Sequence, residues 1–336
     1  MDTTQDISWI SAARAIIEPA HGSQPVIDLI NGAEKTIGLK MFTFTSDDIA
    51  EALLAAQKRG VKVRVMLNPA RSSGSRANDD MKMRLQAGGV TVSWSSPAFA
   101  VTHEKSMVVD SRFAMIATYN FGVKYFTTTR DYGVITEDAN VVAEIEQCFQ
   151  ADWDRREFVR PENSALLWSN RGSRALMCNF IDQAKHTLDV QHPKFVDAVV
   201  LDRLIQAHER GVRVRVICGG KHGISTWDIL DTFASLRLMK LNGIKIRKQK
   251  TLRLHAKLLL ADGQKALIGS MNIDRSAFDL RRELGCFLDA PEAVEAFHQC
   301  FTDDWHEASH YDPPDPLSVH LIDEDDHAHD ADLVHE

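Results

Sequence analysis

The chain has 336 residues, of which 44% are hydrophobic and 26% charged, and this balance is typical of a soluble globular protein. No apolar run reaches the roughly 18–20 residues that a membrane-spanning helix needs. The first residues lack the basic region and apolar stretch of a secretory signal, so we expect a cytoplasmic protein. The five cysteines stand in apolar surroundings, which favours buried free thiols over disulfides or a metal cluster.

The net charge of −8 is concentrated at the C-terminal end of the chain. Residues 312–336 contain nine Asp or Glu and no Lys or Arg, whereas residues 1–311 hold 39 basic and 38 acidic groups. The composition of this tail predicts disorder, with four histidines that we expect to be solvated rather than bound to a metal. The nearly neutral remainder gives no strong overall field that would attract DNA.

Two halves of the sequence repeat each other at an offset of about 150 residues. The repeated segments are 15–23 with 165–173, 60–65 with 211–216, and 148–153 with 300–305. We therefore predict an N-terminal half at 1–157, a C-terminal half at 158–311, and the tail at 312–336. Because the offset is nearly constant, the halves should superpose through a pseudo-two-fold axis.

The elements expected in chain order alternate between strand and helix. Residues 7–17 are weakly amphipathic and more typical of a core segment than of a membrane anchor. A strand is expected at 37–44, followed by a helix that Asp47 or Asp48 can cap and that Gly60 ends. Alternating valines then predict a strand at 61–65.

The second half repeats this order, with a helix that contains Leu201, Leu204 and Ile205 before a strand at 212–216. A closing helix is expected at 141–153 and again at 291–305. Strand–helix alternation predicts the α/β class, with a central sheet in each half and helices on both of its faces.

Segments 102–120 and 254–272 each contain an apolar run, a short polar turn and another apolar run, which predicts two hairpins. If the loops are 111–112 and 263–264, each hairpin presents an imidazole, an ammonium, a hydroxyl and an amide on one face. The opposed pairs would be His103 with Asn120, Lys105 with Thr118, His255 with Asn272, and Lys257 with Ser270.

This set of side chains suits the chemistry of a phosphodiester. Lysine, hydroxyl and amide donors can bind non-bridging oxygens and stabilise a five-coordinate transition state. One neutral imidazole can attack phosphorus while a second, protonated imidazole protonates the leaving oxygen. Two lysines can replace a divalent cation, so we expect neither a metal nor another cofactor.

Simpler interpretations exist for each residue taken alone. A single His-x-Lys on a strand is usually a solvent-facing pair, and Asn120 and Asn272 could simply end strands. Asp110 and Asp262 are typical hairpin-turn residues, and we expect a structural role for them. Recurrence of five matched positions at one offset of 152 favours an enzyme over a phosphate-binding scaffold without catalysis.

At these residues the sequence resembles the phospholipase D superfamily, and the resemblance extends from about residue 12 to 308. It implies two phospholipase D-like halves that build one shared site at their interface, so that a monomer suffices. The residues that the resemblance places in that site are His103, Lys105, Asn120, His255, Lys257 and Asn272.

The resemblance also implies an acidic residue eleven positions after each asparagine, which accepts a hydrogen bond from a catalytic histidine. These positions hold Asp131 and Glu283, and we expect Asp131 to serve His103 and Glu283 to serve His255. The first half departs from the family pattern, with Ala117-Thr118 in place of Gly-Ser. Family precedent for two-motif enzymes favours the N-terminal histidine, His103, as the nucleophile, whereas the basic residues before His255 would favour a neutral His255.

The substrate implied by the resemblance is either a phospholipid or a nucleic acid. An apolar stretch at 94–101 and aromatic residues near 121–126 could line a lipid site, which would require a transient, peripheral encounter with a membrane surface. Trp94 and Phe99 could equally be core residues. Residues 237–257 hold eight Lys or Arg and no acid, which suits a nucleic-acid backbone, an anionic headgroup or a charged edge strand. We favour phospholipid over nucleic acid.

Overall fold

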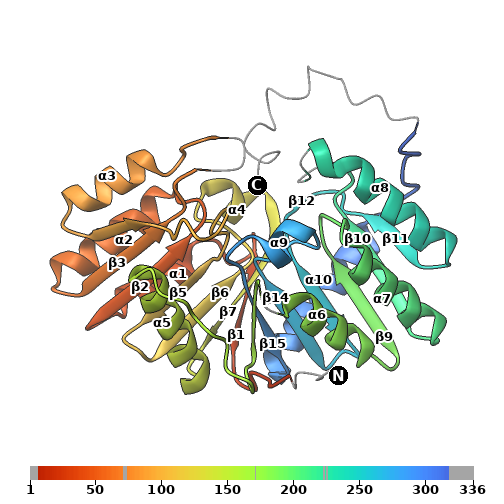
Figure 1. Cartoon of the computed structure of the whole chain (residues 1–336), viewed down its shortest axis with the longest axis horizontal. Helices are drawn as coiled ribbons and strands as arrows, with labels where there is room; N and C mark the ends of the chain where they lie inside the picture. The colour runs from red at the N-terminus through yellow and green to blue at the C-terminus, as the bar shows by residue number, and fades with distance from the viewer. Residues whose placement is uncertain (1–6, 71–73, 171, 222–223, 225, 318–336) are drawn as a thin grey trace.

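A computed structural model describes residues 7–70, 74–170, 172–221, 224 and 226–317. It consists of two α/β halves that lie side by side, each with a sheet and flanking helices (Figure 1). The predicted α/β class is confirmed. The tail, for which we predict disorder, lies outside the described residues from 318 onward.

The two sheets have the same strand order. The first sheet runs β1-β7-β6-β5-β2-β3-β4, and the second runs β8-β15-β14-β13-β9-β10-β11-β16. The strands of the first sheet are β1 (Arg14–Glu18), β2 (Thr36–Met41), β3 (Lys62–Leu67), β4 (Thr91–Trp94), β5 (Ser106–Val109), β6 (Phe113–Ala117) and β7 (Thr129–Thr136). Those of the second are β8 (Leu166–Trp168), β9 (Thr187–Gln191), β10 (Arg213–Cys218), β11 (Lys245–Lys248), β13 (Leu258–Ala261), β14 (Lys265–Gly269), β15 (Leu284–Leu288) and β16 (Ser309–His310).

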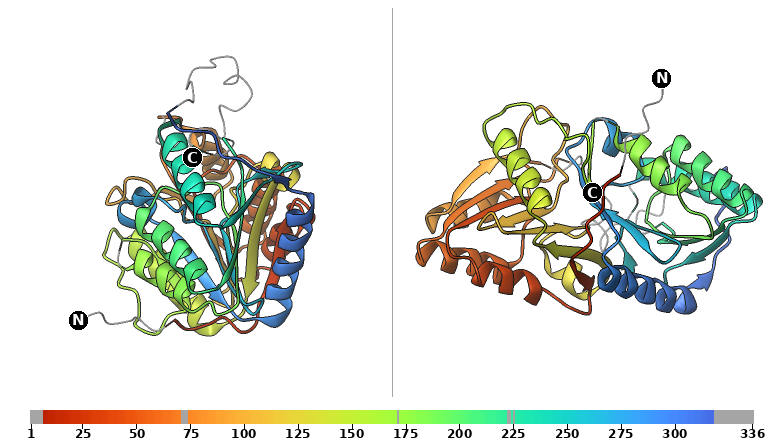
Figure 2. Two further views of the ribbon diagram at one scale, coloured as in Figure 1. Left: turned by 90° about the vertical axis from the view of Figure 1, so that its right-hand side faces the viewer. Right: turned by 90° about the horizontal axis from the view of Figure 1, so that it is seen from below.

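Helices cover both faces of each sheet, and a rotation by half a turn would exchange the helices of one half with those of the other. Seen from below, α5 and the α1–α2 pair lie on opposite faces of the first sheet, as α10 and the α6–α7 pair do on the second (Figure 2). The helices are α1 (Gln24–Asn31), α2 (Asp47–Lys58), α3 (Asp79–Ala87), α4 (Val123–Thr127), α5 (Ala139–Trp153), α6 (Ser173–Asp182), α7 (Ala198–Glu209), α8 (Thr226–Leu241), α9 (Arg275–Asp279) and α10 (Pro291–Glu307).

The local predictions hold with small corrections. The strand expected at 37–44 is β2, which is shorter, and the closing helices are α5 and α10. Ser46, rather than an aspartate, occupies the N-cap position of helix α2, and its side chain makes no capping hydrogen bond. Asp47 and Asp48 lie in the first turn, where their charges interact favourably with the helix dipole. Gly60 follows the helix with φ of 95°, a conformation that suits glycine.

Three hydrophobic clusters form the core. One lies within each half, and the third contains residues from both, including Ile116 and Val134 of the first sheet and Leu258 and Ile268 of the second. The N-terminal segment crosses over, because Ile10 pairs with Leu288 and is fully buried. Burial of Ile10 and Ile16 makes residues 7–17 a core segment, as expected. The shared cluster fixes the two halves against each other.

The predicted hairpin register is wrong by one residue. Val109 pairs with Phe113 and Ala261 with Lys265, so both loops contain three residues instead of two. Asp110 and Asp262 belong to these loops, with φ of 55° and 56°. Their carboxylates accept N–H groups from residues 34–36 and 185–187 over 2.7–3.2 Å, which takes each aspartate out of its strand. Their structural role is as predicted.

Candidate active site

The backbones around the two histidines cross from one half to the other. The N–H groups of His103 and Glu104 donate to the carbonyl of Arg282 at 2.9 and 3.0 Å. In the same way, the N–H groups of His255 and Ala256 donate to the carbonyl of Arg130 at 3.2 and 2.8 Å. The short strand β12 (Arg253–Leu254) continues this pairing against β7 of the first sheet. Each histidine is therefore anchored next to the other half's acidic residue, which is Asp131 on β7 or Glu283 directly before β15.

Each imidazole is held by a carboxylate from the opposite half. His103 Nδ1 lies 2.9 Å from Glu283 Oε2, and His255 Nδ1 lies 2.7 Å from Asp131 Oδ1. The expected pairing of Asp131 with His103 and Glu283 with His255 is wrong. The backbone crossing explains the exchange, because Arg130 and Arg282, which bind the backbones of His255 and His103, directly precede these carboxylates.

The two hydroxyls support the carboxylates instead of facing a substrate. Thr118 Oγ1 donates to Asp131 at 2.5 Å, and Ser270 Oγ donates to Glu283 at the same distance. We expected these hydroxyls to donate to phosphate oxygens, and the structure instead shows them donating to the carboxylates. Thr129, which the sequence analysis missed, adds a second hydroxyl on Asp131 at 2.6 Å. Its position two residues before Asp131 on β7 was the available signal.

The lysines lie beside the histidines in a closed environment. Lys105 Nζ donates to the carbonyl of His103 at 2.8 Å, and Lys257 Nζ donates to that of His255 at 2.8 Å. Lys257 Nζ also lies 3.1 Å from His255 Nε2. All four residues are at most 5% exposed. The charges of Lys105, Lys257 and His255 all act on His103, so these groups of the two halves lie near one another.

The two asparagines differ in their contacts. Asn120 Oδ1 accepts the N–H of Thr43 at 3.3 Å. Asn272 Oδ1 is buried and has no hydrogen-bond partner among the described residues, and the same holds for His103 Nε2. An unpartnered buried polar atom is costly unless a ligand satisfies it. These two atoms are therefore candidates for contact with a substrate.

The electrostatics differ between the two histidine pairs. Burial lowers the pKa of His103 well below its usual value, and the charges of Lys105, Arg281 and Lys257 add to this effect. Burial also lowers the pKa of His255, to about 4, although Asp131 opposes the shift. In both pairs, burial therefore favours the neutral form of the imidazole.

The supporting groups also have displaced pKa values. Burial raises the pKa of Glu283 to about 7. Burial would raise that of Asp131 as well, but His255, Lys257 and the Thr118 hydroxyl hold it below its usual range. Burial and the nearby Lys105 lower the pKa of Lys257 to about 7.

Arg281 and Lys194 are further charged residues near the site that the sequence analysis did not single out. Arg281 is 7% exposed, and its charge affects both His103 and Glu283. Lys194 Nζ binds Asp228 at 2.5 Å and Asp274 at 3.2 Å. Asp274 stands two residues after Asn272 in the sequence, which was the available signal for this ion pair.

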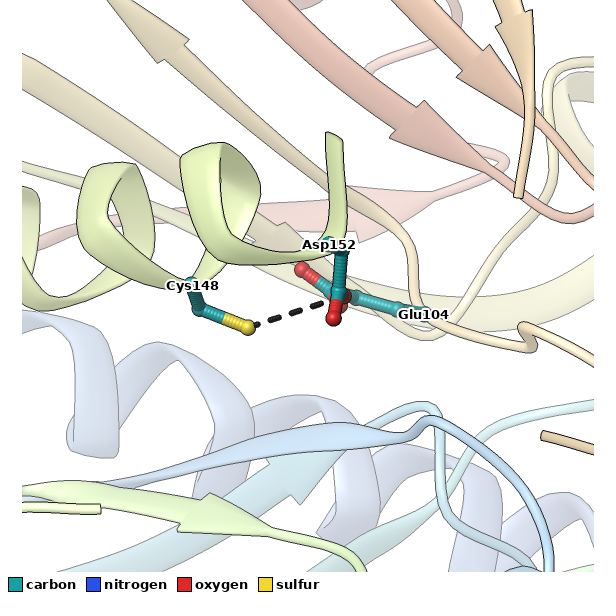
Figure 3. A group of neighbouring side chains, drawn as sticks. All are labelled: Glu104, Cys148 and Asp152. Atoms are coloured by element: carbon teal, nitrogen blue, oxygen red, sulfur yellow. Dashed lines mark hydrogen bonds between the residues drawn. The ribbon is translucent and has the colours of Figure 1, made fainter. Parts of the chain in front are cut away.

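A buried ionic cluster lies next to the site. Glu104, Cys148 and Asp152 converge (Figure 3), with ligand atoms within 4.8 Å of one another, a spacing that could hold a metal ion. The ammonium of Lys40 occupies this position, at 2.9 Å from Glu104, 3.3 Å from the Cys148 sulfur and 2.6 Å from Asp152. The cluster is therefore satisfied by a protein cation.

The cysteines are free, as predicted, and four of the five are buried.

The basic segment 237–257 does not form a free sheet edge, because β16 pairs with β11 and Arg247 donates to the carbonyl of Trp305. Across residues 7–317, apart from the short gaps given above, no helix combines the length and apolar character needed to cross a membrane.

A family model described as cardiolipin synthase, PLD-like domain, matches residues 26–153 and 177–305, one match in each half. A cardiolipin synthase of Clostridium perfringens is 26% identical over 312 residues, which cover 79% of this chain and 64% of that relative. Cardiolipin synthase B of Escherichia coli is 26% identical over 304 residues, covering 78% and 73%. The chain thus spans slightly less than two thirds of the C. perfringens relative.

Among solved structures, phosphatidylserine synthase of Haemophilus influenzae superposes with a TM-score of 0.74 over 94% of this chain and 92% of that one. Sequence identity between the two is 13%, so the similarity concerns the fold alone.

Proposed function

The chain belongs to the PLD-like domain family of cardiolipin synthases, and on this premise we propose that it is a phosphatidyltransferase that acts on phospholipids through a phosphohistidine. The observation that carries the proposal is the pair of buried imidazoles, each held at Nδ1 by a carboxylate from the opposite half. Such a contact directs Nε2 of each ring toward the substrate and stabilises its charged form. Every residue involved comes from one chain, so a monomer is sufficient.

In the first step, His103 Nε2 attacks the phosphorus of a phosphodiester, and the bond from phosphorus to the leaving oxygen breaks. His255, which takes up a proton when the anionic substrate binds, gives that proton to the leaving alkoxide. We assign His103 as the nucleophile because its Nε2 has no partner among the described residues, whereas His255 Nε2 lies against Lys257. Lys105 and Lys257 stabilise the charge on the non-bridging oxygens.

In the second step, an acceptor hydroxyl attacks the phosphohistidine and breaks the phosphorus–nitrogen bond. His255, now neutral, removes the proton of that hydroxyl. The acceptor decides the outcome, since water gives hydrolysis and a lipid alcohol gives transfer. The cardiolipin synthase relatives favour transfer to a lipid alcohol, and with it a peripheral encounter with a membrane surface.

A nucleic acid is the second candidate substrate. The sequence feature that suggested it is the basic segment 237–257. Its Arg247 is committed to a carbonyl and to the ring of Trp305, 4.7 Å away, and Lys240 pairs with Asp312 at 2.6 Å. These contacts leave less of the segment available to a phosphate backbone, so the lipid assignment is preferred.

The test is to incubate the protein with vesicles that contain phosphatidylglycerol and, separately, with single-stranded DNA, both in EDTA. We expect release of glycerol and formation of a product with two phosphatidyl groups, with no cleavage of DNA. Because the site's lysines supply its positive charge, chelation should leave the rate unchanged. Cleavage of DNA without lipid turnover, or activity that requires an added divalent ion, would contradict the proposal.

A further inference from the structure

A cavity of about 320 Å³ lies beside the site, on the other side of the segment that carries Glu283. Four arginines line it: Arg155, Arg156, Arg160 and Arg282. Successive side chains of an extended segment point to opposite faces. Glu283 points toward His103, so Arg282 projects away from the histidines, where it binds Asp152 and lines this cavity. The cavity is therefore distinct from the catalytic centre.

Arg282 has a donor that no described residue binds. Its Nη2 donates to Asp152 Oδ1 at 2.7 Å, while its Nε is buried and has no hydrogen-bond partner among the described residues. Arg130 is its counterpart in the first half, and there Nε, Nη1 and Nη2 are all bound, two to Asp304 and one to the carbonyl of Glu18. The three donor nitrogens of Arg130 are therefore all bound, whereas Nε of Arg282, at the same position of the other half, is not bound by a described residue.

Two of the four arginines in the cavity bind no carboxylate directly. Asp152 balances Arg282, and Asp154 balances Arg156 at 2.5 Å. Arg155 and Arg160 bind backbone carbonyls instead, at 2.5 Å for Trp94 and 2.9 Å for Leu166. Glu157 also lines the cavity, and the buried Glu144 interacts electrostatically with Arg160 from outside it, so the nearby acids match the four arginines in number. A phosphodiester carries one negative charge, and guanidinium groups bind its oxygens through paired hydrogen bonds.

The walls of the cavity are aromatic. The guanidinium carbon of Arg282 lies 4.2 Å from the ring centre of Phe99 and 5.9 Å from those of Phe158 and Trp168. All three rings line the cavity. An apolar wall next to arginines matches the border between the phosphate and the glycerol or acyl part of a lipid.

We propose that this arginine-lined cavity binds the phosphodiester headgroup of a second phospholipid, one that does not undergo the reaction. The choice of a lipid among phosphodiesters rests on the proposed function, whereas the anion site itself rests on the geometry above. The site stands close to the catalytic pair, because Ser169 Oγ in its wall accepts the N–H of Glu283 at 2.8 Å and donates to the carbonyl of Arg281 at 2.5 Å.

The experiment measures binding of short-chain phosphatidylglycerol, dissolved as monomers, by titration calorimetry. The full chain carries His103→Asn so that no turnover occurs. Ala98 is exposed and lines the cavity, so Ala98→Trp fills the space without altering charge. Arg156→Gln removes one guanidinium, and Arg112→Gln is its matched control, since both side chains are 66% exposed and paired with one carboxylate.

We expect Ala98→Trp to remove one binding event and Arg156→Gln to weaken that event by about tenfold, as the loss of one charge-assisted hydrogen bond does. Arg112→Gln should leave it unchanged. Binding that is absent from the His103→Asn protein, or that Ala98→Trp and Arg156→Gln do not affect, would overturn the proposal. Displacement of the lipid by an equal concentration of inorganic phosphate would reduce the cavity to a simple anion site and overturn the lipid assignment.

These outcomes are separable from the proposed function. If the wild-type chain fails to turn over phosphatidylglycerol but the binding event is present and sensitive to Ala98→Trp, the catalytic proposal fails and the second site stands. Circular dichroism of each variant verifies that the fold is retained.

Discussion

The two histidine–carboxylate pairs come from one repeated motif and yet differ in charge. Asp131 accepts hydrogen bonds from His255, Thr118 and Thr129, and its pKa lies below the usual range. Glu283 accepts bonds from His103 and Ser270, but its second oxygen has no partner among the residues that the structure describes, and burial raises its pKa to about 7. An ionised carboxylate stabilises an imidazolium more than a half-protonated one does. The difference suits His255 to the acid role and His103 to the nucleophile role.

A second difference lies behind the pairs. In the first half, Lys40 and Glu104 form a buried ion pair next to Asp152, whereas Gln191 and Ala256 hold the matching positions of the second half. Gln191 there binds Asp304 at 2.6 Å. The second half therefore fills these two positions with neutral side chains in place of a buried Lys–Glu ion pair.

The largest expected effect is on turnover. His103→Asn and His255→Asn should each reduce the rate on phosphatidylglycerol by about 10⁴-fold, because each step needs both a nucleophile and an acid or base. With a substrate whose leaving group needs no protonation, His255→Asn should recover much of the first step and His103→Asn none. Equal recovery in both variants, measured by product release, would remove the proposed division between the pairs.

The next effect concerns the buried ion pair. Lys40→Gln alone leaves Glu104 unpaired in the core and should destabilise the protein by about 3–5 kcal/mol. Lys40→Gln with Glu104→Ala copies the second half and should recover most of that loss. Urea unfolding of both variants measures the difference. A double variant as unstable as the single one would show that the halves are not interchangeable here.

The supporting carboxylates should differ in their effect on catalysis. Asp131→Asn should reduce turnover by about 100-fold and Glu283→Gln by about tenfold, within the range for groups that orient a reacting histidine. The reason is that Asp131 supplies a full negative charge to the acid, while Glu283 supplies less. A reversed order of the two rate losses would assign the acid role to His103.

The smallest effect is a dependence of stability on pH. The folded-state pKa of Glu283 is raised from 4.5 to about 7, so its stabilising contribution is complete below about pH 4.5 and is lost as the pH rises toward 7. Glu283→Gln removes this loss. The free energy of unfolding of the variant relative to wild type should therefore be about 2 kcal/mol higher at pH 8 than at pH 5. Urea unfolding at both pH values measures it, and an equal difference at the two would mean that Glu283 stays ionised.

The sequence was sufficient for the features that repeat. Recurrence at one offset predicted two repeated α/β units, and the repeated strand order agrees, because sequence spacing survives folding. The catalytic role of the six residues that recur with it stays a prediction. The hairpin register was missed because it depends on Asp110 and Asp262, whose carboxylates bind a distant loop and lengthen each turn. Such a tertiary contact leaves no local trace in the residues around the turn.

The exchange of partners between the halves was missed for a related reason. Asp131 is closer in sequence to His103, but the carbonyls of Arg130 and Arg282 bind the backbone of the opposite histidine. Pairings of this kind follow from how two sheets meet, which a single sequence does not encode locally. The same applies to Lys40, Glu104 and Asp152, which come together from three separate elements.

The most direct test of the division between the histidines is to trap the phosphoenzyme. A labelled substrate with a leaving group that needs no protonation is mixed with His103→Asn and with His255→Asn, and acid-labile, base-stable label on the protein is counted. The account predicts that His255→Asn accumulates label while His103→Asn takes up none. Label on His103→Asn together with none on His255→Asn would reverse the roles and contradict it.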